Sequence, residues 1–397
     1  MTGGGVFMPG RGTGIEHLAA WIGGRFGTAP GGKPAPAWLA QPLAECRSVV
    51  LLLLDGVGVR QIADHAPQGA LARARLATLR SVFPSSTAPA ITALASGLPP
   101  HRHGNPGWFV WHPGIGRVVR SLPGDFRGDP PGIFDADGLW RWPALSAAMD
   151  PPATVVQPAF IADSDFSRYA YRGARRVGYE DLDGLHDRIV EAVVAGDGGY
   201  VYAYAPHFDT AAHAHGCRHP DAGRVLLAFD ALFERLGASL AGSDALLLAT
   251  ADHGFVDIAP ECQLSMADHP ELAELLARPL AGEPRVAFAE PLPGARHEFL
   301  DRAAQALGHA FDIRPTAALA SAGWFGEGEA DPAFFERSGS VALVGRDGWA
   351  LLDSVPGETA HPLIGMHGGT TVDEIAVPLA AVRRGVPLPG AGSATQG

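Results

Sequence analysis

Three short apolar runs, each followed closely by an acidic residue, constrain the fold of this chain more than any other feature. The runs cover residues 49–54, 199–204 and 244–250. Each is bounded by turn residues, which is typical of a buried strand in a parallel sheet. In an open α/β sheet the carboxyl ends of such strands meet at one edge, where ligands bind. We therefore expect Asp55, Asp209 and Asp252, which follow the three runs, to lie in one crevice.

Helical patterns between these runs indicate the fold class. Residues 182–195 and 223–240 have apolar positions spaced as on one face of a helix, and residues 70–79 are also expected to be helical. Strands that alternate with helices predict an α/β protein with a largely parallel central sheet. Helices on both faces of that sheet would make a three-layer α/β/α sandwich.

The chain is expected to form one main domain with a smaller insertion. Residues 1–36 are rich in glycine and proline and are expected to be a partly ordered lead-in. Residues 259–353 contain short helical pieces and weak strands, which indicates an inserted cap subdomain. The main domain would then comprise residues 37–258 and 354–390.

Composition excludes several classes of partner. Of 397 residues, 47% are hydrophobic and 18% charged, which suits a globular protein with a large core. The net charge of −12 and the lack of a basic run argue against binding of nucleic acid or of an acidic membrane. Three cysteines without paired spacing indicate reduced thiols, and no apolar run approaches membrane-spanning length. We expect a soluble, cytoplasmic protein without a secretory leader. The sequence predicts no particular oligomeric state.

Residues 82–97 form a segment that is a candidate for a catalytic hydroxyl group. A turn rich in proline and serine leads into small residues that are compatible with a helix ending at Gly97. Thr87 would lie near the helix N-terminus, where free backbone N–H groups and the helix dipole favour an anion. Taken alone, the segment favours an ordinary N-cap role for Ser85, Ser86 and Thr87 over a catalytic hydroxyl.

Candidate metal ligands lie at four separate strand ends or loops. Asp209 and His213 have the i, i+4 spacing that brings two ligands to one side of a helix, and Asp252 is followed directly by His253. Three carboxylates and three imidazoles suffice for two divalent ions, and this mixture of oxygen and nitrogen suits zinc, with manganese as the alternative. The six candidates are Asp55, Asp209, His213, Asp252, His253 and His367.

The order of these residues around Thr87 resembles the alkaline phosphatase superfamily, and within it the type I phosphodiesterase/nucleotide pyrophosphatase family. Residues 83–89 (FPSSTAP) are similar to the nucleophile segment of that family. Residues 96–104 (SGLPPHRHG) are similar to the motif that follows it. The resemblance spans residues 47–258 and 363–382, and it implies an alkaline phosphatase-like fold.

The resemblance also implies a division of the ligands between two ions. One ion would be held by Asp209, His213 and His367. The other would be held by Asp55, Asp252 and His253, with the Thr87 oxygen as a further ligand. Thr87 would attack phosphorus in a small phosphate ester, release an alcohol or phosphate, and be freed by water.

Several activities share such a site. We expect hydrolysis of phosphodiester or pyrophosphate bonds through a covalent phospho-threonine at Thr87. The alternatives are cleavage of a C–P bond, as in phosphonoacetate hydrolase, or hydrolysis of a phosphomonoester. A binding protein that has lost catalysis is a further alternative, which the full set of ligands disfavours. A sulfatase is not expected, because the Thr87-x-Pro89 pattern lacks the cysteine or serine that those enzymes modify.

The chain departs from nucleotide-cleaving relatives at two positions. They carry asparagine three residues after the nucleophile and four residues after the His-Gly pair, where this chain has Ala90 and Trp108. In those relatives the second asparagine helps to hold a phosphoryl oxygen. Asn105, His103 or Arg102 are candidates to replace this hydrogen-bond donor, or else they only shape the loop. Trp108 is a candidate for stacking on the substrate, with packing as the alternative.

Overall fold

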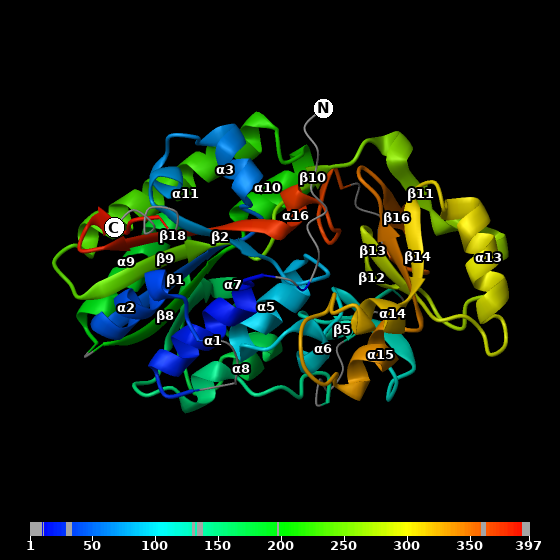
Figure 1. The fold of residues 1–397 in the computed structure, drawn as a ribbon, viewed down its shortest axis with the longest axis horizontal. Helices are drawn as coiled ribbons and strands as arrows, with labels where there is room; N and C mark the ends of the chain where they lie inside the picture. The colour runs from blue at the N-terminus through cyan, green and yellow to red at the C-terminus, as the bar shows by residue number, and fades with distance from the viewer. Residues whose placement is uncertain are drawn as a thin grey trace.

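The two largest β-sheets, of eight and seven strands, lie side by side in the molecule, each with helices packed against it (Figure 1). The computed structural model describes residues 10, 12–28, 34–128, 132, 138–196, 198–358 and 363–390. Within these ranges, no helix is both long and apolar enough to cross a lipid bilayer.

The larger sheet has five parallel strands at its centre, in the order β9-β1-β8-β6-β7. They are β1 (Ser48–Leu54), β6 (Thr154–Pro158), β7 (Arg175–Tyr179), β8 (Gly199–Ala205) and β9 (Ala245–Thr250). Every residue of β1, β8 and β9 is buried, which explains the three apolar runs. The register pairs Leu54 with Ala205 and Leu53 with Thr250, so these strands end level with one another. The predicted α/β class is confirmed.

Helices cover both faces of this sheet and complete the three predicted layers (Figure 1). One group contains α3 (Val59–His65), α4 (Ala70–Arg73), α9 (Leu182–Val194), α10 (His207–His215) and α11 (Pro220–Ser239). The other contains α1 (Ile15–Arg25), α2 (Ala37–Glu45), α5 (Thr87–Ser96), α7 (Ala159–Ala162) and α8 (Asp165–Ala170). The helices predicted at residues 182–195 and 223–240 are confirmed as α9 and α11.

At one edge of the larger sheet, a segment predicted to be a helix is largely a strand. Strand β18 (Ala376–Arg383) runs antiparallel to β9 and also pairs with β2 (Arg75–Arg80) and β19 (Val386–Pro387). Of the predicted helix at residues 70–79, only α4 is helical, and the remainder belongs to β2. Alanine, leucine and arginine favour a helix locally, but pairing with a strand from the far end of the chain overrides that preference.

The first helix belongs to the core, which differs from the expected lead-in at residues 1–36. Ile15, Leu18 and Ile22 of α1 are fully buried. The Glu16 carboxylate of the same helix accepts a hydrogen bond from the buried Arg80 guanidinium. Part of the expected lead-in, residues 1–9, 11 and 29–33, lies outside the described residues.

The second sheet is antiparallel, in the order β14-β15-β13-β12-β3-β4-β5. Residues 259–353, the expected cap, supply β12 (Ala281–Glu283), β13 (Val286–Ala289), β14 (Phe311–Pro315) and β15 (Val341–Gly345). The segment before β6 supplies β3 (Phe109–His112), β4 (Arg117–Arg120) and β5 (Asp125–Phe126). Gly282 pairs with Phe109 where the two parts meet, so this sheet is not built from the cap segment alone.

Helix α13 (Arg296–Leu307) lies at the outer end of the second sheet (Figure 1). The shorter helices are α6 (Pro100–His103), α12 (Pro270–Ala273), α14 (Thr316–Ser321), α15 (Pro332–Ser338), α16 (Val372–Ile375) and the 3-10 turns Leu145–Ala148, Pro260–Cys262 and Met266–Asp268. The shorter strands are β10 (Val256–Asp257), β11 (Gln263–Ser265), β16 (Ala350–Leu352) and β17 (Gly365–Met366).

A buried ion pair joins the second sheet to the larger one. The Arg285 guanidinium donates to both carboxylate oxygens of Glu374, at 3.0 and 2.9 Å, and neither side chain is exposed. Glu374 also accepts hydrogen bonds from Gly369 N and from the Thr371 hydroxyl, both at 2.8 Å. The pair therefore anchors the loop that carries His367.

We predict that Arg285→Met lowers the free energy of unfolding by about 3–5 kcal/mol, because it leaves the Glu374 carboxylate buried without its cation. Urea denaturation followed by tryptophan fluorescence measures this change. The control is Arg302→Met, whose partner Glu298 is 52% exposed, and it should change the stability by less than about 0.5 kcal/mol. Equal losses in the two variants would contradict the role given to the buried pair.

Candidate active site

Two aspartates lie at the carboxyl ends of adjacent strands of the larger sheet. Asp55 follows β1 and Asp252 follows β9. The Tyr204 hydroxyl donates to Asp55 Oδ2, and the backbone N–H groups of Gly56 and His253 each donate to Asp252 Oδ1 at 3.0 Å. The other oxygens, Asp55 Oδ1 and Asp252 Oδ2, are buried without a hydrogen-bond partner. Each carboxylate is thus held by one oxygen and leaves the other open for a ligand.

This arrangement concentrates negative charge. Burial and the neighbouring Asp252 raise the pKa of Asp55 well above its ordinary value. A buried carboxylate without a positive partner is costly, so a bound cation would stabilise both aspartates.

His253 lies between the two aspartates and the candidate nucleophile. Its Nε2 is 3.4 Å from Asp55 Oδ1, 3.5 Å from Asp252 Oδ2 and 3.0 Å from Thr87 Oγ1. Its Nδ1 is 3.1 Å from the Gly254 carbonyl, which favours a proton on Nδ1 and leaves Nε2 as the ligand atom. The side chain is fully buried.

A second group forms around Asp209 of α10. His213, one turn later, places Nε2 3.3 Å from Asp209 Oδ1, and His367 Nε2 lies 3.7 Å from the same oxygen. The His213 Nδ1 is 2.9 Å from the Gly365 carbonyl, which turns Nε2 toward Asp209. Asp209 Oδ1 is buried without a hydrogen-bond partner. This oxygen is therefore a third open ligand atom.

Electrostatics in this second group favour a charged carboxylate beside imidazoles. Although burial opposes its charge, the pKa of Asp209 is below its ordinary value because His213 lies beside it. Against the same opposing effect of burial, Asp209 raises the pKa of His213 to about 9. Burial and then the neighbouring His253 and His213 hold the pKa of His367 well below its ordinary value, so its ring is neutral.

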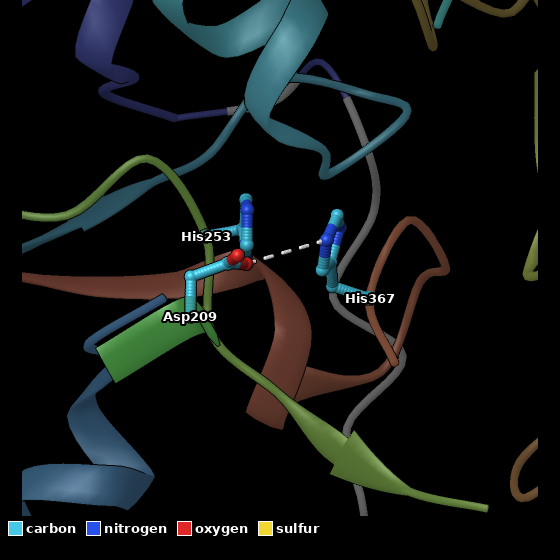
Figure 2. A group of neighbouring side chains, drawn as sticks. All are labelled: Asp209, His253 and His367. Carbon is cyan, nitrogen blue, oxygen red and sulfur yellow. Dashed lines mark ion pairs between the residues drawn. The ribbon is translucent and has the colours of Figure 1, made fainter. Parts of the chain in front are cut away.

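The two groups are adjacent and share one space. The rings of His253 and His367 stack with their centroids 3.7 Å apart, and the Asp209 carboxylate lies beside His253, with a dashed line marking its ion pair with His367 (Figure 2). Ligand atoms of Asp209, His253 and His367 lie within 4.8 Å of one another, as do those of Asp55, Asp252 and His253. The six predicted ligands and Thr87 are therefore together in the structure, with His253 at the junction of the two sets.

Thr87 is the first residue of α5, and its side chain does not cap that helix. No side-chain cap hydrogen bond forms at the start of α5, where Ser86 is the N-cap residue. The Ser85 hydroxyl instead donates to the Gly369 carbonyl at 2.8 Å, and Ser85 N donates to the Gly368 carbonyl at 3.2 Å. The turn before Thr87 is thus fastened to the loop of His367. Ser86 occupies the N-cap position, but none of the three hydroxyls caps α5 through its side chain.

The substrate contacts suggested for His103 and Asn105 are not supported by their hydrogen bonds. His103 Nε2 is 3.1 Å from the Pro89 carbonyl, and burial lowers the pKa of His103 to about 3. The Asn105 amide nitrogen lies 3.2 Å from the Thr92 hydroxyl, and its oxygen accepts from Gly107 N at 3.3 Å. Both side chains brace α5 and the following loop.

The loop after Gly104 also contacts Glu283, a residue that was not predicted from the sequence. Glu283 ends β12, and its Oε1 accepts hydrogen bonds from the Ser86 hydroxyl and, at 2.7 Å, from the Trp108 backbone N–H. Burial raises the pKa of Glu283 to about 7, against the lowering effect of these hydrogen bonds. No motif surrounds this glutamate in the sequence, and only the pairing of β12 with β3 brings it to the site.

We predict that Asp55→Asn stabilises the metal-free protein. Because the pKa of Asp55 is raised in the folded state, the cost of its charge appears as the pH rises above the ordinary aspartate range and is greatest at alkaline pH. In a chelator at about pH 8, calorimetry should show Asp55→Asn melting about 2–4 °C above the wild type. The difference should shrink as the pH falls toward about 4.

Asp187→Asn is the control for this comparison, because its carboxylate is 78% exposed. It should leave the melting temperature of the metal-free protein unchanged. A melting temperature for Asp55→Asn below that of the wild type, under chelation, would contradict the predicted repulsion.

Solved structures with a similar fold include the following two. With murine ectonucleotide pyrophosphatase/phosphodiesterase 5 the TM-score is 0.65 at 17% identity, over 84% of this chain and 88% of that one. With phosphonoacetate hydrolase from Sinorhizobium meliloti 1021 the TM-score is 0.62 at 19% identity, over 88% and 93%. None of the curated proteins matches this sequence.

The model of the type I phosphodiesterase/nucleotide pyrophosphatase family matches residues 49–370. This range covers most of the chain and contains Thr87 together with all six candidate ligands. The predicted resemblance is confirmed. The chain belongs to the type I phosphodiesterase/nucleotide pyrophosphatase family, whose hydrolases act on phosphoester bonds.

Proposed function

We propose that this protein is a two-metal phosphohydrolase that cleaves phosphodiester or pyrophosphate bonds through a covalent phospho-threonine at Thr87. The observation that carries the proposal is the position of the Thr87 hydroxyl, 3.0 Å from His253 at the junction of two carboxylate–imidazole groups. A small phosphate ester is the proposed substrate, and the cytoplasm is the proposed compartment.

The donor atoms of the site fit two divalent cations. The buried oxygens without partners, Asp55 Oδ1, Asp209 Oδ1 and Asp252 Oδ2, each lie within 4 Å of a histidine nitrogen. We propose Asp209, His213 and His367 for one ion. For the other we propose Asp55, Asp252 and His253, with the Thr87 oxygen. This mixture of ligands favours zinc, with manganese as the alternative.

When bound, the two ions would lower the pKa of the Thr87 hydroxyl and offset the negative charge that develops on the attacking and leaving oxygens. The protein itself would hold the Thr87 hydroxyl in position for the reaction. Ser85 fastens the turn before Thr87, and α5 begins at Thr87, so free N–H groups of its first turn are available to phosphoryl oxygens. The Thr87 Oγ–P bond forms while the bond to the leaving group breaks, and water then cleaves the phospho-threonine.

Two relatives support this range of substrates. An inactive form of the murine relative is described in complex with AMP, and the Sinorhizobium meliloti enzyme in complex with phosphonoformate. The family favours cleavage of a phosphoester bond over cleavage of a C–P bond. Hydrolysis of a C–P bond or of a phosphomonoester is the second candidate, because the same ligands and nucleophile would serve both. The complete ligand set argues against an inactive binding protein.

We predict that Thr87→Ala lowers kcat/KM for a phosphodiester by about 10³-fold or more, because it removes the nucleophile. The measurement is steady-state hydrolysis of diester, monoester and phosphonate substrates, each with and without added zinc or manganese. The wild type should act best on a diester and lose activity on chelation.

Thr78→Ala is the matched control, since Thr78 is exposed on β2, and it should retain wild-type activity. Undiminished hydrolysis by Thr87→Ala would exclude the covalent route through this residue.

A further inference from the structure

One acidic side chain of the second sheet contacts the turn before Thr87. Glu283 accepts a hydrogen bond from Ser86, the residue directly before Thr87, and another from the Trp108 backbone. On its other side it packs on Gly368, the residue after His367, where an added Cβ would lie 3.2 Å from the Glu283 Cβ. Glu283 therefore lies one residue away from both the proposed nucleophile and a proposed metal ligand.

No hydrogen-bond donor neutralises Glu283, although against the raising effect of burial the neighbouring His213 imidazole lowers its pKa. Both hydrogen bonds come from neutral donors and go to the same oxygen, Oε1. In the part of the chain that the structure describes, Glu283 forms no ion pair with an arginine, whereas its neighbour Arg285 is committed to Glu374. Glu283 thus places a carboxylate charge against Ser86, the residue before Thr87, near the proposed position of the phosphoryl group.

Such a charge distinguishes between phosphate substrates. A phosphodiester carries one negative charge, whereas a phosphomonoester above neutral pH carries two, and phosphonoacetate carries a carboxylate in addition to its phosphonate. Repulsion at close range in a partly desolvated site grows with the charge of the substrate. The Trp108 backbone N–H donates to Glu283 and is therefore not available to the substrate.

We propose that Glu283 is a specificity-determining residue that biases the site toward singly charged phosphodiesters and against dianionic phosphomonoesters and phosphonates. This inference rests on the proposed function and narrows its substrate class. The second sheet thereby supplies the selectivity, while the larger sheet with its helices and loops carries Thr87 and the proposed ligands.

The test compares Glu283→Gln and Glu283→Ala with the wild type, using metal-loaded full-length protein at about pH 8.5. The glutamine keeps an oxygen that accepts from Ser86 and Trp108 but removes the charge, and the alanine removes both. The probes are bis(p-nitrophenyl) phosphate, p-nitrophenyl phosphate and phosphonoacetate, with inorganic phosphate as an inhibitor. The control is Glu290→Gln, because Glu290 accepts analogous bonds from the hydroxyl and N–H of Ser340.

We expect Glu283→Gln to raise kcat/KM for the monoester by about tenfold or more and to strengthen phosphate inhibition similarly. The diester value should stay within about threefold of the wild type. An unchanged diester-to-monoester ratio in an active, folded Glu283→Gln protein would overturn the inference. A purely structural pattern would also overturn it, in which Glu283→Ala lowers kcat/KM for all substrates alike and Glu283→Gln keeps the wild-type values. A wild type without chelator-sensitive diester hydrolysis would instead overturn the function on which the inference rests.

Discussion

The carboxylates of Asp55, Asp252 and Asp209 lie together at the carboxyl edge of the larger sheet, and the rest of the site is arranged around their repulsion. The register of β1 with β8 and β9 makes this proximity unavoidable, because the three strands end level with one another. Tyr204 and the N–H groups after Asp252 hold one oxygen of each strand-end aspartate and leave the other open. Stability and function therefore oppose one another at Asp55, since the charge that weakens the metal-free fold is one that would hold an ion.

The turn before Thr87 is positioned by both halves of the molecule. Ser85 is fastened to the His367 loop, and that loop is fixed by Glu374 and its buried partner Arg285 from the second sheet. Ser86 contacts the second sheet directly through Glu283. Thr87 is thus held between two sheets whose strands come from distant parts of the chain, which limits its freedom before any substrate arrives.

The ends of buried strands were predictable because apolar runs and the acids after them are local signals. Asp55, Asp209 and Asp252 were found in this way, whereas the role of Thr87 was implied only by the family resemblance. The structure brings Thr87 and the six candidate ligands together. Long-range pairing was not predictable. Residues 75–80 have helical propensity but pair with β18, and Glu283 reaches the site only because β12 pairs with β3. The hydrogen bonds of His103 and Asn105 depend on how α5 packs, which no motif records.

We propose that two cations occupy this cluster, one for each ligand set. Elemental analysis and anomalous diffraction on protein purified with excess zinc test it most directly. We expect two ions per chain, roughly 4 Å apart, one beside Asp209, His213 and His367 and the other beside Asp55, Asp252 and His253. A single ion, or none, in the metal-saturated protein would contradict it.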